Sequence, residues 1–264
     1  MGCSIAVAGK GGVGKTLVSG MLARHLADLG QGPVLVVDAD PNANVNEALG
    51  MPVGQSVGAI REEMKDAVGT LPGAMSKVEY LEYKIETALS EGDDVDLLVM
   101  GRPEGPGCYC WANNLLRDLL RRVAVRYRFV VIDNEAGMVH LARRLTQDLV
   151  VLLIISVPTL RGIDTASRLS LIPVEVETRI GNKALLVNRV PPGGLSAEAE
   201  QRIQHGPFRF LGSIPEDPEV TRRDQELGGL ASLYPDSLLA RHVAQMATHL
   251  GLHGPVAGRV SVGR

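Results

Sequence analysis

Residues 9–16 have the sequence Gly-Lys-Gly-Gly-Val-Gly-Lys-Thr, a pattern that can bind phosphate. The glycines let backbone N–H groups face an anion, Lys15 can reach the β- and γ-phosphates of a nucleotide, and the Thr16 hydroxyl can ligate Mg²⁺. A glycine-rich turn that binds nothing would leave Lys10 and Lys15 crowded together without an anion. We therefore expect nucleotide binding, and the contacting residues are Gly11, Gly12, Val13, Gly14, Lys15, Thr16 and Leu17.

Two carboxylates, Asp38 and Asp40, follow the apolar run at residues 34–37. An acidic residue that leaves a strand beside a phosphate loop can hold a Mg²⁺-bound water. A second one can orient the water that attacks the γ-phosphate. An Asx turn closed by Pro41 would explain the proline but not the two carboxylates. We interpret both aspartates as site residues.

A cysteine pair, Cys108 and Cys110, lies in a stretch rich in glycine and proline at residues 101–111. In an extended backbone, residues i and i+2 project to one side, so the two thiolates could face one metal ion. Two thiolates are half of a tetrahedral sulfur site, and a symmetric dimer would supply the other half. Zn²⁺, Ni²⁺ and Cu⁺ all accept thiolates, so the ligands leave the ion open. The alternative is that both cysteines are small buried apolar groups.

The elements that must position these residues follow from seven apolar runs that alternate with amphipathic stretches of helix length. The runs lie at residues 5–8, 34–37, 95–100, 129–132, 149–155, 184–187 and 210–214. The alternation predicts an α/β fold with a doubly wound, mainly parallel sheet flanked by helices. Ligands bind such sheets at the carboxyl ends of the strands. Helical spacing is found at residues 17–29, 62–68, 78–89, 113–125, from Arg161 onward, and at 238–250.

The composition is consistent with a single domain that spans all 264 residues. A formal net charge of −3 gives no reason to expect nucleic acid or anionic lipid as a partner. No apolar run approaches the length of a membrane span, and the first residues enter the phosphate-binding unit directly, so we expect a cytoplasmic protein without a signal peptide. We expect Cys3 to be buried and inert, residues 50–92 to form peripheral helices, and residues 253–264 to fray.

The phosphate loop with its early lysine, Lys10, resembles the deviant Walker A motif of the SIMIBI ATPases, which include nitrogenase iron protein, MinD and ParA. The resemblance implies Mg²⁺-dependent ATP hydrolysis by a nucleotide-dependent homodimer, in which Lys10 crosses to the nucleotide of the partner. The Asp-x-Asp-Pro-x-x-Asn string is similar to switch I, which implies that Asp38 lies near Mg²⁺ and Asp40 polarises the attacking water. Asp133 and Gly137 match the switch II pattern Asp-x-x-Ala-Gly, which implies contacts with Mg²⁺ through water and with the γ-phosphate.

The same resemblance implies where the adenine base binds. Asn188 leaves a predicted strand where this ATPase class uses asparagine to recognise adenine, and its amide offers both a donor and an acceptor. A turn asparagine is the alternative. Residues 212–217 resemble the second loop on the base side. The base-side residues that we expect are Asn188, Arg189, Pro215 and Glu216.

Two further strings narrow the resemblance to one branch. Arg-Pro-Glu-Gly-Pro-Gly-Cys-Tyr-Cys at residues 102–110 and Asp-Asn-Glu-Ala-Gly-Met at residues 133–138 resemble the CooC family, ATPases that help to insert nickel into carbon monoxide dehydrogenase. The match covers nearly the whole chain in motif order, whereas nitrogenase iron protein, MinD and ParA lack this cysteine loop. It implies that Cys108 and Cys110 of two subunits hold Ni²⁺ or Zn²⁺, with carbon monoxide dehydrogenase as the client.

Three alternatives remain open from the sequence. The chain could instead belong to a sister group of ATPases that serves the nickel site of acetyl-CoA synthase. An iron–sulfur or electron-carrier ATPase like nitrogenase iron protein would need two well-separated cysteines, and only Cys3 is available beside the pair. A partition ATPase bound to DNA or to a membrane would need a basic face or an amphipathic anchor, and neither is evident.

Overall fold

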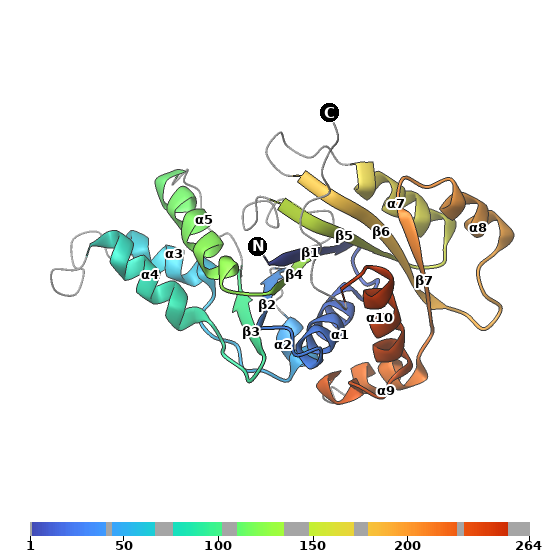
Figure 1. Ribbon diagram of the computed structural model, residues 1–264, viewed down its shortest axis with the longest axis horizontal. Coiled ribbons are helices and arrows are strands. Elements are labelled where there is room, and N and C mark those ends of the chain that lie inside the picture. Colours follow the sequence, from blue (N-terminus) through green and yellow to red (C-terminus); the bar gives the residue numbers. More distant parts are fainter. Residues whose placement is uncertain are drawn as a thin grey trace.

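The computed structural model describes residues 2–40, 44–66, 76–101, 110–134, 148–171, 179–225 and 230–252. Seven parallel strands form one sheet in the order β3-β2-β4-β1-β5-β6-β7 (Figure 1). The strands are β1 (Cys3–Gly9), β2 (Val34–Ala39), β3 (Val95–Val99), β4 (Phe129–Asn134), β5 (Asp148–Ser156), β6 (Arg179–Val190) and β7 (Arg209–Pro215). Each of the predicted apolar runs lies on one of these strands, except that the run at residues 95–100 extends one residue beyond β3. The predicted fold class is confirmed.

Helices cover both faces of the sheet. One buried cluster joins the sheet to α1, α2, α10 and the 3-10 helix η1, and the other joins it to α3, α4, α5, α7 and α8. Ala6 and Ala8 of β1 point into the second cluster, whereas Ile5 and Val7 point into the first. The helices are α1 (Lys15–Asp28), α2 (Val45–Leu49), α3 (Val57–Asp66), α4 (Lys77–Ala88), α5 (Cys110–Val125), α7 (Leu160–Leu171), α8 (Ala197–Gln204), α9 (Pro218–Gln225), η1 (Leu230–Leu233) and α10 (Leu238–His249).

The six predicted helices correspond to α1, α3, α4, α5, α7 and α10, with different ends. The segment at residues 50–92 holds α3 and α4, of which α3 begins five residues before its predicted start. The N-terminus of α4 is fixed by a capping box, because the Ser76 hydroxyl accepts from Glu79 N–H at 3.2 Å and the Glu79 carboxylate accepts from Ser76 N–H at 2.8 Å. The tail at residues 253–264 lies outside the described residues.

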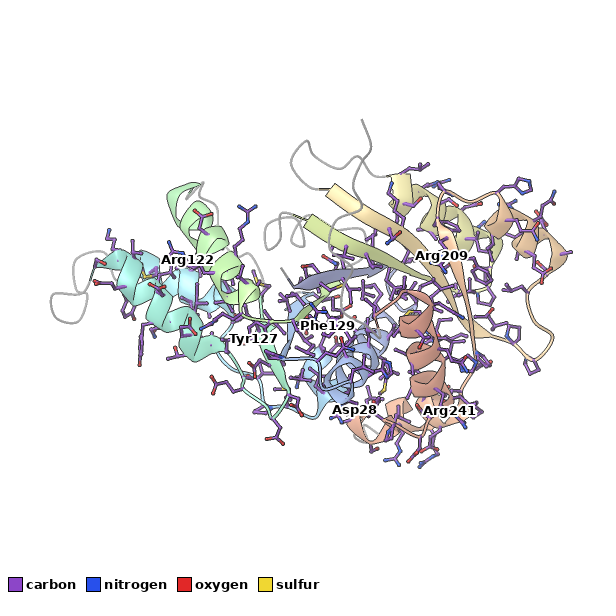
Figure 2. All side chains as sticks on the ribbon, in the orientation of Figure 1. Asp28, Arg122, Tyr127, Phe129, Arg209 and Arg241 are labelled. Atoms are coloured by element: carbon purple, nitrogen blue, oxygen red, sulfur yellow. The ribbon has the colours of Figure 1, made fainter. Side chains whose placement is uncertain are left out.

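The core is aliphatic and contains few aromatic groups. Figure 2 shows Phe129 inside the molecule and Arg122, Arg209 and Arg241 at its surface. Cys3 is also fully buried, so its prediction as a buried cysteine is confirmed. Burial raises the pKa of its thiol to about 11 despite the nearby Arg128, which disfavours the reactive thiolate.

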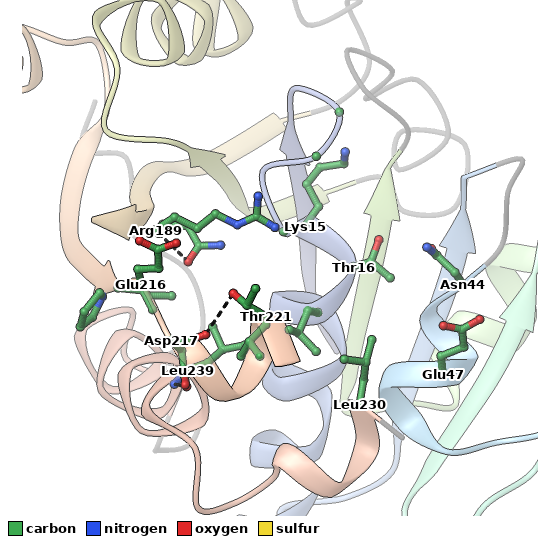
Figure 3. A pocket seen from close by; sticks show the side chains of 18 of the residues that line it. Lys15, Thr16, Asn44, Glu47, Arg189, Glu216, Asp217, Thr221, Leu230 and Leu239 are labelled. Atoms are coloured by element: carbon green, nitrogen blue, oxygen red, sulfur yellow. Dashed lines mark hydrogen bonds between the residues drawn. The ribbon is translucent and has the colours of Figure 1, made fainter. Parts of the chain in front are cut away.

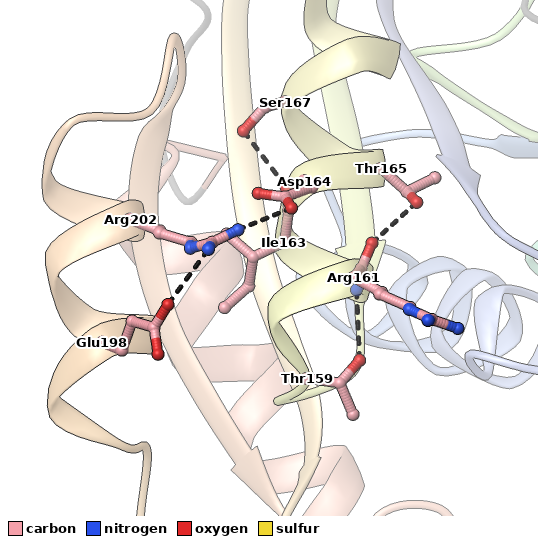
Figure 4. Close-up of polar contacts among 9 residues, drawn as sticks. Thr159, Arg161, Ile163, Asp164, Thr165, Ser167, Glu198 and Arg202 are labelled. Carbon is pink, nitrogen blue, oxygen red and sulfur yellow. Dashed lines mark hydrogen bonds and ion pairs between the residues drawn. The ribbon is translucent and has the colours of Figure 1, made fainter.

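Helices α7 and α8 pack side by side on the same face and share an ion-pair cluster (Figure 4). Arg202 of α8 contacts the carboxylates of Asp164 at 2.6 Å and Glu198 at 3.0 Å. All three side chains are substantially exposed, so the cluster contributes little to stability. Within the ranges described above, no helix is both long and apolar enough to cross a bilayer.

Candidate functional site

The phosphate loop connects β1 to α1 at the carboxyl edge of the sheet. Gly12 and Gly14 have φ values of 77° and 92°, a left-handed backbone that favours glycine. A Cβ at Gly14 would lie 2.5 Å from Asn188 Nδ2, so a side chain is excluded there by contact as well. Helix α1 starts at Lys15 with no side-chain cap from Gly14. The positive end of the helix therefore offers its first N–H groups to an anion.

Lys15 is held inside this loop. Its side chain is only 7% exposed, and Nζ donates one long hydrogen bond of 3.4 Å to the backbone carbonyl of Lys10. An ammonium group has three donors, and a buried cation is stabilised by a nearby negative charge. The loop therefore presents a fixed positive charge to a phosphate group. Lys10 itself is exposed.

Asp38 and Asp133 lie side by side beneath the loop. They are register partners on β2 and β4, and both side chains are buried, at 1% and 0% exposure. Asp133 accepts hydrogen bonds from the hydroxyls of Thr16 at 2.8 Å and Ser19 at 3.1 Å. Asp38 accepts from the backbone N–H groups of Asp40 and of Val45. The sheet order thus joins motifs that are far apart in the sequence.

The electrostatics of this carboxylate pair favour a cation. Burial raises the pKa of Asp38, and it raises the pKa of Asp133 to about 6 although Thr16 and Ser19 donate to it. The charge of Asp38 adds to the shift at Asp133. Mg²⁺ prefers oxygen ligands such as hydroxyl and carboxylate groups. Thr16 would bind the ion directly, and both aspartates would contact it through water. Bound there, Mg²⁺ would neutralise charge on the β- and γ-phosphate oxygens.

Asp133→Asn is expected to stabilise the nucleotide-free chain at neutral pH. The folded carboxyl holds its proton more tightly than the unfolded one, so the free energy of unfolding falls as the pH rises from about 4 to about 6. The amide is not ionised, and at pH 7.5 it should recover roughly 2–3 kcal/mol, a rise in Tm on the order of 5 °C. Thermal denaturation in a chelator measures this gain.

The same measurement at pH 4 is the control for Asp133→Asn. There the wild-type carboxyl is largely protonated in the folded chain, so the difference in Tm should disappear. A variant that is no more stable than the wild type at pH 7.5, or equally stabilised at pH 4, would contradict the burial of an ionised Asp133.

A cavity of about 710 Å³ opens above the loop (Figure 3), a size that suits a small-molecule ligand. It brings together most of the predicted site residues: Gly11, Gly12, Gly14, Lys15, Thr16, Leu17, Asp40, Asn188, Arg189, Pro215 and Glu216. Lys10 and Val13 do not line it, and Asp38 and Asp133 lie buried beneath it. Gly137 lies outside the described residues.

Asn188 contacts the phosphate loop itself. Its Nδ2 donates to the carbonyl of Val13 at 2.8 Å, and its Oδ1 accepts from the backbone N–H of Arg189 at 2.9 Å. One N–H of the amide thus bonds to the loop, and among the described residues the other has no acceptor, so it can donate to a ligand. Arg189 has a φ of 56°, a left-handed conformation that is rare outside glycine and is often found at functional sites.

The sequence reasoning missed several residues that line the cavity. Glu47 comes from α2, and the others are Val220, Thr221, Leu230 and Leu239. Asn44, Ile214 and Asp217 also line the cavity, and they lie in the strings that were predicted to form switch I and the second base-side loop. The Asp217-Pro218 pair was a usable signal for the start of α9, because aspartate followed by proline is typical of a helix start. Indeed, the Asp217 carboxylate accepts from the backbone N–H of Glu219 at 3.1 Å, at the beginning of α9.

The prediction of an extended backbone through the cysteine pair is wrong at Cys110. Helix α5 begins at Cys110, three residues before its predicted start at residue 113. The helical spacing of apolar residues continues back to Trp111, which the shorter prediction left in the loop. Cys108 lies outside the described residues, and within the described part no group of three or more His, Cys, Asp or Glu could hold a metal ion.

Comparison with known proteins shows the family of this chain. A family model described as the CobQ/CobB/MinD/ParA nucleotide binding domain matches residues 4–228. The chain belongs to this family. The protein is an ATPase. This follows from its membership of the CobQ/CobB/MinD/ParA family and from relatives that are named ATP-binding proteins. The expected relationship to MinD and ParA is confirmed.

Individual relatives of this CobQ/CobB/MinD/ParA-type ATPase cover most of its length. An uncharacterized ATP-binding protein of Methanocaldococcus jannaschii is 42% identical over 83% of this chain and 87% of the relative. The carbon monoxide dehydrogenase accessory protein CooC of Rhodospirillum rubrum is 33% identical over 96% of this chain and 98% of the relative. A ParA family ATPase from Chlorobium tepidum shares the fold, with a TM-score of 0.68 at 21% identity over 94% of this chain and 98% of that one.

Proposed function

We propose that this ATPase carries nickel to carbon monoxide dehydrogenase. The observation that carries the proposal is the cysteine pair, Cys108 and Cys110, in a chain that aligns with a carbon monoxide dehydrogenase accessory protein over nearly the full length of both. Thiolates are ligands for Ni²⁺ and Zn²⁺. In the ATP-bound homodimer, the pairs of two chains hold one ion, and hydrolysis opens the dimer so that the ion is delivered.

Hydrolysis uses the residues of the cavity. The phosphate loop and Lys15 hold the β- and γ-phosphates, and Asp40 orients a water in line with the γ-phosphorus. The water oxygen bonds to phosphorus while the bond to the oxygen shared with the β-phosphate breaks. One proton of the water stays on the attacking oxygen, the other passes to a second oxygen of the phosphate, and ADP and inorganic phosphate leave. The fixed charge of Lys15 stabilises the negative charge that moves to the leaving oxygen.

Placement along the chain supports a link between the nucleotide and the cysteines. Strand β3 ends at Val99, at the same carboxyl edge as the phosphate loop, and α5 begins at Cys110. The cysteine motif therefore lies in the connection that leaves the nucleotide edge of the sheet. Hydrolysis of the nucleotide can shift the start of this connection through β2, because the carbonyl of Asp38 accepts from the N–H of Met100 at 2.8 Å.

Activation of a nickel-free client tests this function. Carbon monoxide dehydrogenase prepared without nickel is mixed with limiting Ni²⁺, the ATPase and Mg-ATP, and carbon monoxide oxidation is followed over time. We expect the rate of activation to rise on the order of 10-fold with ATP and not with ADP. The proposal is contradicted if activation is the same without the ATPase, or if nickel-free acetyl-CoA synthase responds and carbon monoxide dehydrogenase does not.

A further inference from the structure

Two hydroxyl groups on one face of α1 hold the two oxygens of a single buried carboxylate. Thr16 and Ser19 are three residues apart on the helix, so their side chains lie on the same face. The Thr16 hydroxyl donates to Oδ2 of Asp133 at 2.8 Å, and the Ser19 hydroxyl donates to Oδ1 at 3.1 Å. The phosphate-binding motif at residues 9–16 explains Thr16, but it does not explain Ser19.

Ser19 is closed off from solvent and from the nucleotide cavity. Its exposed fraction is 0%, like that of Asp133, and it does not line the cavity. A serine hydroxyl has one proton to donate, and that of Ser19 goes to Asp133. Ser19 can therefore influence a bound ligand through this carboxylate, without touching the ligand itself.

The helix that carries both hydroxyls is packed at a fixed distance from Asp133. Gly20 follows Ser19, and a Cβ built on it would lie 2.6 Å from the Cβ of Ala48 on α2. The absence of a side chain at Gly20 thus lets α2 pack closely against α1. On the sheet side, apolar residues of α1 and of β4 belong to the same buried cluster. Helix α1 is held between α2 and the sheet, so Ser19 cannot move away from Asp133 without disturbing the core.

The other buried carboxylate of the site is held in a different way. Asp38 accepts from the backbone N–H groups of Asp40 at 3.1 Å and Val45 at 3.0 Å, which both lie after β2. Asp133 instead accepts at each oxygen from a side chain of the helix that carries the phosphate loop. A donor on each oxygen restricts rotation of the carboxylate. Asp133 is therefore fixed relative to the phosphate loop, whereas Asp38 is tied to the segment that follows β2.

We propose that Ser19 is a positioning residue that orients Asp133 and thereby sets how tightly the site holds nucleotide-bound Mg²⁺. With Ser19 on Oδ1, the carboxylate keeps Oδ2 toward Thr16. The Thr16 hydroxyl gives its proton to Oδ2, so its lone pairs remain for the ion. Removing a partner that orients a metal ligand typically costs on the order of 10- to 100-fold in metal affinity. The inference rests on nucleotide binding with Mg²⁺ and is independent of the cysteine pair.

The effect of Mg²⁺ on nucleotide binding measures this role without hydrolysis. The Kd of a non-hydrolysable ATP analogue is determined by titration calorimetry in Mg²⁺ and again in EDTA. The ratio of the two Kd values reports the coupling between the ion and the nucleotide. For Ser19→Ala we expect this ratio to fall about 10-fold. The Kd in EDTA should stay within about twofold of the wild type, because the phosphate loop is unchanged.

Ser170→Ala is the matched control. Ser170 is also a buried helical serine, on α7, and its hydroxyl donates to the carbonyl of Ser167 at 2.7 Å. It does not line the cavity, so both Kd values should stay within about twofold of the wild type. Ser19→Thr keeps a hydroxyl at the same position. Its coupling should therefore be closer to that of the wild type than the coupling of Ser19→Ala.

The coupling ratio decides the outcome. A fall in Ser19→Ala that is absent from Ser170→Ala supports the proposal. An unchanged ratio in Ser19→Ala, or an equal loss of affinity in Mg²⁺ and in EDTA, would overturn it. The same holds if Ser19→Thr, with an unchanged Kd in EDTA, loses as much coupling as Ser19→Ala. If Ser19→Ala does not fold, Ser19→Cys replaces it, since a thiol fills the space but is a weak donor, and an unchanged ratio there overturns the proposal.

Discussion

Lys15→Gln is expected to lower the kcat of ATP hydrolysis by at least about 100-fold, because it removes the one positive charge that the loop holds toward the phosphates. The Lys15 side chain is nearly buried, so solvent screens its charge little. Glutamine has a similar length and preserves the packing of the loop, which leaves charge as the main difference. Phosphate release at saturating Mg-ATP measures the effect, with circular dichroism as a check of folding.

Lys183→Gln provides the control for this charge. Lys183 on β6 is also partly buried and donates to a backbone carbonyl, that of Ser170 at 2.7 Å, but it does not line the cavity. Its replacement should leave kcat within about twofold of the wild type. If Lys15→Gln retained more than a tenth of the wild-type kcat, the loop would not be the catalytic phosphate site.

Cys108→Ala and Cys110→Ala are each expected to abolish binding of nickel while ATP hydrolysis stays within about twofold of the wild type. Removing one thiolate from each chain leaves two of the four sulfurs in a shared site, too few to hold the ion tightly. The residues that bind ATP are in other loops, so basal turnover should continue. Elemental analysis after gel filtration, together with phosphate release, measures both effects on one sample.

Cys3→Ala is the matched control for the cysteine variants. Cys3 is fully buried, and its raised pKa keeps the thiol protonated, so it is unsuited to bind a metal ion. This variant should bind as much nickel as the wild type. A loss of hydrolysis in Cys110→Ala as complete as in Lys15→Gln would show that the cysteines belong to the catalytic site and would contradict separate roles.

The strands could be predicted because a parallel sheet covered on both faces requires almost continuous apolar runs. The predicted start of β6 is wrong, because the first residues of this strand are not an apolar run. The strand begins at Arg179, five residues before its apolar run, in a segment that contains Asn182 and Lys183. Helix α2 has five residues and α9 is strongly polar, so neither shows a helical period in the sequence. Both helices contribute to the nucleotide cavity.

The phosphate loop could be predicted because its residues are contiguous, whereas the contacts that join the loop to the other predicted site residues could not, because those residues are far apart in the sequence. Asp38 and Asp133 are neighbours only because β4 lies between β2 and β1 in the sheet, an order that local sequence does not determine. The hydrogen bond from Asn188 to Val13 spans 175 positions. The hydrogen bond from Ser19 to Asp133 likewise follows from tertiary packing and joins residues 114 positions apart.

The stoichiometry of nickel in the ATP-bound state tests the central claim most directly. The wild-type protein is loaded with Ni²⁺ and a non-hydrolysable ATP analogue, and native mass spectrometry counts the chains and the ions in each particle. We predict particles of two chains with a single nickel ion that is absent from Cys108→Ala. One ion in each single chain, retained after Cys108→Ala, would contradict a site shared between two subunits.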